Sequence, residues 1–92
     1  MAEIQVTHNI KGGQFEVQLE DQLAYLEYRL GVNSIILVNT EVPQALEGRG
    51  IGGTLVKASL EYARANQLGV VAFCPFVQSY LKRHPEYQDM VK

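Results

Sequence analysis

The spacing of hydrophobic residues changes midway along the 92-residue chain, and this change limits the folds open to it. Before residue 43, apolar and polar side chains alternate, which is typical of strands with one buried face. Four such segments are separated only by short turns, and they comprise residues 4–8, 15–19, 22–30 and 34–42. The third segment places on one face the residues Ala24, Leu26, Tyr28 and Leu30. Strands joined in this way predict an antiparallel meander.

Beyond residue 50 the apolar period becomes helical. Apolar and small residues lie three and four positions apart from Ile51 to Ala63, and Gly69 is suited to end this helix. Residues 70–73 form a short apolar run, which we expect to be a fifth, buried strand. A strand–helix–strand unit of this kind predicts a parallel strand pair with a right-handed crossover.

A short C-terminal helix is expected to begin at Pro75, because proline favours the first helical position. The expected buried face of this helix comprises Phe76, Val77, Tyr80 and Leu81. These elements predict an α/β (α+β) fold in a single domain over residues 1–92, with an antiparallel meander followed by strand–helix–strand and the short helix.

Charge and hydropathy exclude several classes of partner. The net charge is −2 and the basic residues are scattered, which argues against nucleic acid. No apolar run is long enough to span a bilayer, and residues 1–5 lack the features of a signal peptide. A single cysteine cannot form an internal disulfide, so we expect a reducing, cytoplasmic setting. No metal is expected, because no cluster has metal-ligand spacing.

A glycine-rich segment lies between the meander and the long helix. It comprises Gly48, Arg49, Gly50, Ile51, Gly52 and Gly53. The first turn of a helix has backbone N–H groups without partners, and glycines let an anion approach them closely. The segment therefore predicts an anion-binding loop, while the simpler alternative is a tight turn without a ligand. No Gly-Lys-Ser/Thr follows, so this is not a P-loop.

Three short motifs occur in order along the chain, and their combination is more specific to one family than any single motif. Thr-Glu-Val-Pro lies at 40–43, Gly-Arg-Gly-Ile-Gly at 48–52, and Cys-Pro-Phe-Val at 74–77 is followed by Arg-His-Pro-Glu-Tyr at 83–87. With Gly50 and Gly52 in the Gln/Arg-x-x-Gly-x-Gly/Ala pattern, the chain resembles the GNAT N-acetyltransferase superfamily. It is most similar to a family of small single-domain GNAT-like proteins, over nearly its whole length.

The resemblance implies acetyl-CoA as the bound co-substrate. The pyrophosphate of coenzyme A would lie on the backbone amides of residues 48–53. The pantetheine would run between the strands at 34–42 and 70–73, where the backbone around Thr40 and Val42 could pair with it.

Two residues depart from the family pattern. Glu47 takes the Gln/Arg position and brings negative charge near the pyrophosphate. Asn39 stands where many members carry a histidine, so a base supplied by that histidine is missing here.

Cys74 is the first candidate for chemistry. It would be the N-cap of the helix that begins at Pro75, where the helix field lowers the pKa of a thiol. The resemblance implies that it lies near the thioester, either as a nucleophile that takes the acetyl group or as a contact. The alternative is a small, partly buried apolar residue.

Three further residues have open roles. Asn39 and Glu41 share one face of a strand, where Glu41 is a candidate general base or a solvated carboxylate and Asn39 contacts the ligand or satisfies a strand edge. Tyr80 is a candidate proton donor to the leaving thiolate, and core packing is the alternative.

Two functions follow from these residues. The first is transfer of acetyl from acetyl-CoA to an unidentified amine or thiol on a small molecule or protein. The second is a CoA-binding sensor or interaction module without turnover, which the missing histidine favours. We expect no membrane partner and a monomer or weak homodimer.

Overall fold

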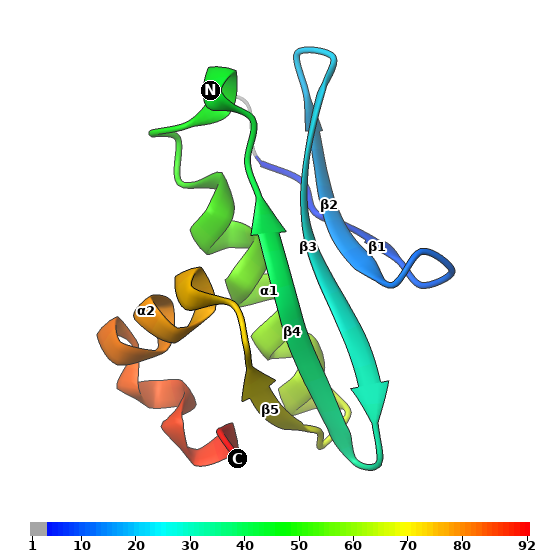
Figure 1. Cartoon of the computed structure of the whole chain (residues 1–92), viewed down its shortest axis with the longest axis vertical. Helices are drawn as coiled ribbons and strands as arrows, with labels where there is room; N and C mark the ends of the chain where they lie inside the picture. The colour runs from blue at the N-terminus through cyan, green and yellow to red at the C-terminus, as the bar shows by residue number, and fades with distance from the viewer. Residues whose placement is uncertain (1–3) are drawn as a thin grey trace.

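A five-stranded sheet organises the fold, and its strands stand side by side in chain order (Figure 1). The computed structural model describes residues 4–92. Met1, Ala2 and Glu3, part of the segment considered above for a signal peptide, lie outside the described residues. Along the chain the elements are β1 (Thr7–Asn9), β2 (Gln14–Leu19), β3 (Gln22–Gly31), β4 (Ser34–Glu41), η1 (Gln44–Leu46), α1 (Ile51–Ala65), β5 (Gly69–Ala72), α2 (Pro75–Arg83) and η2 (Pro85–Met90).

The predicted antiparallel meander is confirmed by the pairing of β1 with β2, β2 with β3 and β3 with β4. Between β2 and β3, Glu20 and Asp21 both adopt positive φ, 51° and 62°. Two such residues form the tight turn whose twist matches that of the flanking strands. The first strand is shorter than predicted and begins at Thr7, although Ile4 and Val6 still pack against the core.

The predicted parallel pair of β4 and β5 is also confirmed, but the pairing stops halfway along β4. The last paired residues are Leu37 and Ala72, while β4 continues to Glu41. The Leu37 carbonyl accepts hydrogen bonds from the amides of both Phe73 and Cys74, at 3.0 and 3.2 Å. Beyond this point the two strands part, so the main chain of residues 38–41 has no backbone partner on the β5 side. The fifth strand therefore ends before Phe73, which the sequence analysis had included.

A β-bulge marks the same place on the other side of β4. Glu27 pairs with Asn39 but Tyr28 pairs with Leu37, so β4 carries one extra residue there. A bulge increases the local twist of a strand and bends it. The bulge therefore lies level with the point where β4 and β5 part.

One face of the sheet is covered by α1, whose apolar stripe packs against β2, β3, β4 and β5. Leu26, Ile35 and Leu55 are fully buried in this layer. Each such side chain stabilises the fold by about 1.5–3 kcal/mol. Within the described residues, none of the helices has the length and apolar character needed to cross a membrane.

The end of α1 differs from the prediction, because Gly69 does not cap it. Gln67 takes the left-handed conformation, with φ 57°, and the amide of Leu68 bonds to the carbonyl of Ala63 at 2.8 Å. This is the Schellman arrangement. Gly69 instead begins β5, where a side chain would collide with the stem of Lys92. Gly69 thus lies at a close crossing with the flexible side chain of the exposed Lys92, and it does not end the helix.

The C-terminal helix begins at Pro75 as predicted, and its residues Val77, Tyr80 and Leu81 are buried. Phe76 was expected on the same face but is 41% exposed, because it lies over the start of α1 rather than in the core. Leu30 was likewise expected inside, and it is 59% exposed because it lies at the end of β3, next to the turn.

Candidate functional site

The loop before α1 depends on two glycines. Gly48 and Gly50 have φ values of 82° and 76°, in the left-handed region that other residues rarely adopt. A Cβ atom on either would meet nothing within 4 Å, so both face open space. Backbone conformation, and not crowding, therefore requires glycine here.

The backbone amides at the start of α1 are free. Gly50 is the N-cap, and among the described residues no acceptor bonds to the N–H groups of residues 50–53. The first bond of the helix runs from the amide of Thr54 to the carbonyl of Gly50, at 3.0 Å. Four unpaired donors at a helix N-terminus concentrate partial positive charge, which favours an anion.

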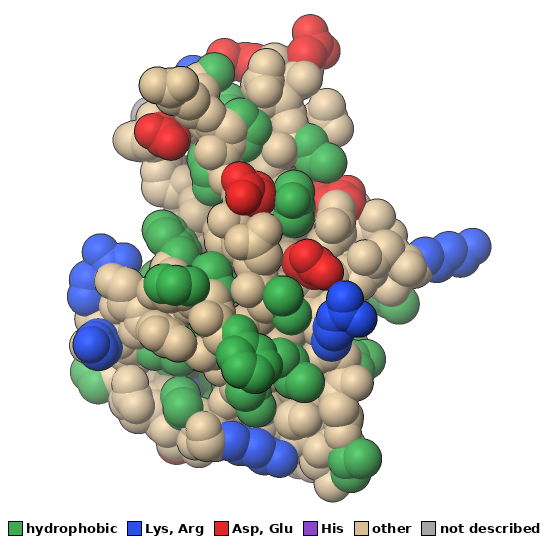
Figure 2. All heavy atoms as spheres, in the orientation of Figure 1, with side chains coloured by type: hydrophobic (Ala, Val, Ile, Leu, Met, Phe, Trp, Pro, Cys, Tyr) green, Lys and Arg blue, Asp and Glu red, His purple; other side chains and the backbone are tan. Residues whose placement is uncertain are grey.

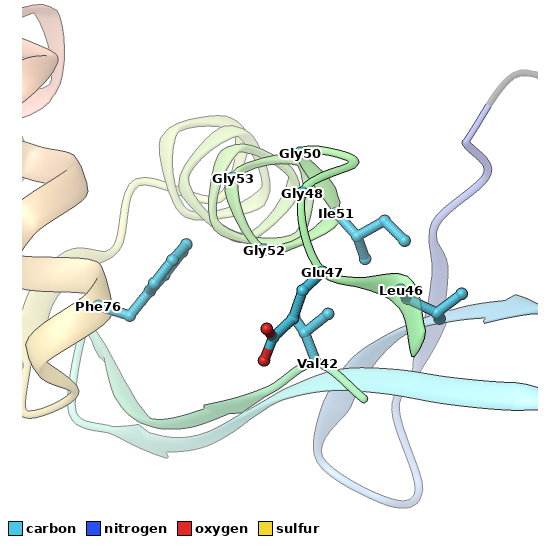
Figure 3. A pocket seen from close by; sticks show the side chains of 9 residues that line it. All are labelled: Val42, Leu46, Glu47, Gly48, Gly50, Ile51, Gly52, Gly53 and Phe76. Carbon is cyan, nitrogen blue, oxygen red and sulfur yellow. The ribbon is translucent and has the colours of Figure 1, made fainter. Parts of the chain in front are cut away.

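These amides border a hollow of about 190 Å³. Its lining comprises Val42, Leu46, Glu47, Gly48, Gly50, Ile51, Gly52, Gly53 and Phe76. The Glu47 carboxylate points into the space between Val42 and Phe76 (Figure 3). It makes no ion pair or hydrogen bond with the described residues. Amides at one end and apolar walls at the other suit an anionic group attached to a less polar chain, whereas the Glu47 carboxylate would repel such a group.

The other two glycines serve packing. A Cβ atom on Gly52 would lie 2.6 Å from the Phe76 ring, and one on Gly53 would lie 3.6 Å from the Tyr80 ring. The absence of side chains on this face of α1 lets α2 approach. The glycine-rich segment therefore has two different roles. Gly48 and Gly50 permit the positive φ of the loop, and Gly52 and Gly53 permit the close packing of α2 on α1.

Arg49 is held away from the hollow. Its guanidinium donates to the Glu20 carboxylate at 2.5 and 3.3 Å, at the tip of the β2–β3 hairpin. The hydrogen bond and charge of Arg49 lower the pKa of Glu20. Sequence separation hides this pairing, because the two residues are 29 positions apart.

Cys74 is buried at the N-cap of α2, as predicted. Its thiol donates to the Thr40 hydroxyl oxygen at 3.5 Å. Burial raises the pKa of this thiol, but the Thr40 side chain and the first-turn amides of Val77 and Phe76 favour the thiolate, and the net pKa lies below its usual range. The amides act at longer range than a capping hydrogen bond, since the Cys74 side chain makes no such bond.

The remaining candidates on β4 lie on the opposite face. Thr40 pairs with the buried Leu26 and so points to the covered side, whereas Glu41 pairs with Tyr25 on the uncovered side. Asn39 shares the face of Glu41, as predicted. The structure thus brings Thr40 and Cys74 together, and it separates them from Asn39 and Glu41 by the thickness of the sheet.

Tyr80 belongs to the core, and its ring stacks on His84 with a centroid distance of 4.0 Å. Burial raises the pKa of Tyr80, and nearby Glu86 adds to the effect. The hydroxyl consequently stays protonated at neutral pH. Two features of the site were not predicted from the sequence. These are the position of Phe76 in the wall of the hollow and the contact between Thr40 and Cys74. The exposed position of Phe76 has no sequence signal, because an apolar residue on an amphipathic helix predicts burial.

In the part of the chain that the structure describes, no three His, Cys, Asp or Glu side chains gather closely enough to hold a metal ion.

Comparison with known proteins identifies a family. Residues 14–90 match the model of GCN5-related N-acetyltransferases. The protein named NATD1 from Gallus gallus is 38% identical over 85 residues, covering 89% of this chain and 77% of that protein. NATD1 from Homo sapiens is 35% identical over 85 residues, covering 89% and 75%. The solution structure of a GCN5-like candidate N-acetyltransferase from Staphylococcus aureus is similar at 30% identity, with a TM-score of 0.77, covering 100% of this chain and 91% of that one.

Proposed function

Because this chain belongs to the GCN5-related N-acetyltransferase family, we propose that it binds acetyl-CoA and transfers the acetyl group to an amine or thiol acceptor. The observation that carries the proposal is the set of unpartnered amides at residues 50–53 beside an open hollow. A diphosphate supplies the negative oxygens that such donors bind.

The proposed pose follows from the free backbone. The pyrophosphate accepts hydrogen bonds from the amides of the loop and first turn, from Gly48 to Gly53. The pantetheine then enters the gap between β4 and β5, where the main chain of residues 38–42 has no partner on that side. An extended amide chain pairs with such a strand edge as another strand would. The thioester would end near Thr40 and Cys74.

Direct transfer is the simpler chemical route. The nitrogen of an amine attacks the thioester carbonyl carbon, a C–N bond forms, and the C–S bond breaks. The nitrogen loses its proton to a base. Glu41 is the candidate, exposed on the uncovered face and without an ion pair to the described residues, and it can serve only where the acceptor reaches the thioester through the gap between β4 and β5. The departing CoA thiolate takes a proton, for which the Tyr80 hydroxyl is the candidate donor.

A covalent route would use Cys74. Its thiolate attacks the thioester carbon, CoA leaves as the thiol after protonation, and the acetyl group rests on the Cys74 sulfur. The acceptor amine then attacks this new thioester and releases the thiolate. The lowered pKa of Cys74 supports this route, because the thiolate is the nucleophile.

Asn39 supports a second candidate function, a CoA-binding module without turnover. A carboxamide does not titrate, so it cannot replace a histidine that acts as base. Release of free CoA with a panel of amines separates an enzyme from such a module.

Calorimetric titration with acetyl-CoA tests the binding step. We expect the wild type to bind acetyl-CoA. Gly50→Val should bind it at least tenfold more weakly, because a side chain at this position distorts the loop that holds the free amides of residues 50–53. Gly13 also has positive φ, 66°, but lies in the β1–β2 turn, so Gly13→Val controls for the effect of a side chain at positive φ away from the loop, although its Cβ would also lie 3.3 Å from the Tyr28 carbonyl oxygen. Absence of binding by folded wild type, or equal affinity in all three proteins, would overturn the proposal.

A further inference from the structure

Glu47 is the one charged residue among the nine described residues that line the hollow beside the free amides. Its side chain is exposed, and its carboxylate points into the space between Val42 and Phe76 (Figure 3). Within the described chain this carboxylate makes no ion pair and accepts no hydrogen bond. A diphosphate on the amides of residues 50–53 would therefore lie close to a negative charge that no neighbouring cation neutralises.

The chain on both sides keeps Glu47 at this place. Leu46, directly before it, is fully buried, and Arg49, two residues later, pairs with the Glu20 carboxylate. The backbone of Glu47 is therefore held beside the loop, and rotation of the side chain cannot carry the charge far from the hollow. The ion pair with Glu20 also engages Arg49, which is the basic residue nearest to Glu47 in the sequence.

The surface around this end of the molecule adds to the effect. Figure 2 shows a face on which carboxylates lie mostly in the upper half, toward which β4 runs, whereas most Lys and Arg side chains lie in the lower half. A field of this sign disfavours an approaching anion. The free amides attract the diphosphate locally, and the side-chain charges around them oppose it.

The path proposed for the pantetheine contains no such conflict. The main chain of residues 38–41 has no backbone partner on the β5 side, and the apolar side chains of Val42, Ile51 and Phe76 line the hollow next to it. The amide groups of the pantetheine are neutral, so they can pair with a strand edge without being repelled by Glu47. The negative charge therefore acts on one part of the ligand and not on the other.

We propose that Glu47 determines the specificity of the site between a thioester that carries the diphosphate and one that does not. Its carboxylate lowers the affinity for the nucleotide end of acetyl-CoA and leaves the affinity for the pantetheine arm unchanged. The inference rests on the proposed function, because it takes the free amides and the gap between β4 and β5 as parts of one acetyl-CoA site.

Three ligands separate the parts of acetyl-CoA. Acetyl-dephospho-CoA lacks only the 3′-phosphate and keeps the diphosphate, whereas acetyl-pantetheine lacks the diphosphate and the nucleoside. Compared with the wild type, Glu47→Gln should bind acetyl-CoA and acetyl-dephospho-CoA about tenfold more tightly, because a neutral side chain no longer repels the diphosphate. Its affinity for acetyl-pantetheine should stay within about twofold of the wild-type value.

Two further variants identify the cause of such a gain. Glu47→Ala removes the charge without adding a hydrogen-bond donor, so it should gain as much affinity as Glu47→Gln. Asp21→Asn changes the net charge by the same amount in the β2–β3 turn, outside the lining of the hollow, and is the matched control. It should bind all three ligands as the wild type does.

Calorimetric titration of the four proteins with the three ligands measures these affinities, and circular dichroism checks that each protein is folded. Equal binding of acetyl-CoA by the wild type and both Glu47 variants overturns this inference and leaves the proposed function intact. An equal gain for acetyl-pantetheine, a gain in Glu47→Gln but not in Glu47→Ala, or the same gain in Asp21→Asn overturns it as well. Absence of acetyl-CoA binding by all four folded proteins overturns the proposed function and this inference together.

Discussion

The Cys74 sulfur lies 3.5 Å from the Thr40 hydroxyl oxygen, and this contact joins β4 to the start of α2 where β4 and β5 part. The thiol donates in the neutral form. Once the thiol is ionised, the hydroxyl can turn and donate to the sulfur. Thr40 therefore stabilises the thiolate, and the contact ties the reactivity of Cys74 to a residue on another element.

Thr40→Val should raise the pKa of Cys74, because valine keeps the volume but cannot donate to the thiolate. The rate of alkylation by iodoacetamide as a function of pH measures this pKa, and its midpoint should move upward. Thr54→Val removes a hydroxyl that bonds to the Gly50 carbonyl instead, so it should leave the midpoint unchanged. A midpoint that moves equally in both variants would show that Thr40 has no special role.

The covalent route predicts an acetylated protein. After mixing with acetyl-CoA, intact-mass spectrometry should find one added acetyl group on the wild type and none on Cys74→Ser. Transfer to an amine that continues unchanged in Cys74→Ser would leave direct attack as the route.

Gly52→Ala should destabilise the protein by about 1–3 kcal/mol, because the new methyl overlaps the Phe76 ring. The Phe76→Ala change should recover most of this loss in the double variant. Urea unfolding of the two single variants and the double variant gives the coupling between the residues. Additive losses would mean that the two side chains do not compete for space.

Stability should fall as the pH drops below about 6.5, because burial lowers the pKa of His8 in the folded state. The sign follows from linkage. The unfolded chain takes up a proton near pH 6.5 while folded His8 stays neutral, so stability present above that pH is lost as the pH falls toward the folded pKa. His8 is held by the Tyr28 hydroxyl at 2.6 Å and stacks on Phe15 at 4.2 Å.

The measurement is urea unfolding between pH 7.5 and 5, above the range in which carboxylates titrate. His8→Gln should flatten the slope. A slope that persists in His8→Gln would assign the effect to another group.

The protein should lose stability at alkaline pH, because the hydrogen bond between Tyr87 and Glu61 is lost when Tyr87 ionises. Its hydroxyl donates to the Glu61 carboxylate at 2.6 Å, and this bond raises the pKa of Tyr87 to about 12. Because the folded pKa exceeds the unfolded value of 10.0, the stabilisation is complete below pH 10 and is lost as the pH rises toward 12.

Tyr87→Phe should cost about 1–2 kcal/mol at pH 8, and the difference from the wild type should shrink at pH 11. Unfolding by urea at the two pH values tests this. Tyr25→Phe, on the opposite face of the sheet, serves as the control and should change little at pH 8. A constant difference at both pH values would contradict the assigned pKa.

Much of the fold could be predicted because the hydrophobic period records which side of each element is buried. The strands, both helices and the parallel crossover follow from it. The bulge at residues 38–39 could not be predicted, since an extra residue in β4 leaves the apolar pattern almost unchanged. The close contact between Gly69 and Lys92, which lies 23 positions later, could not be predicted either, because it depends on tertiary structure.

The candidate site was predictable only in its backbone. Glycines and a proline restrict φ directly, so the loop at 48–53 and the helix start at Pro75 could be found in the sequence. Side-chain partners depend on distant segments. Arg49 turns to Glu20, and Phe76 lies on Gly52, and neither contact leaves a local signal.

The pairing of Arg49 with Glu20 ties the loop before α1 to the tip of the β2–β3 hairpin. Both side chains are exposed, so dissolved ions weaken their attraction. Added salt would then weaken the binding of an anionic ligand in two ways. It would screen the ligand from the free amides of residues 50–53, and it would weaken the Arg49–Glu20 pair that holds the loop. A steep dependence of affinity on ionic strength would therefore overstate the number of direct contacts to phosphate.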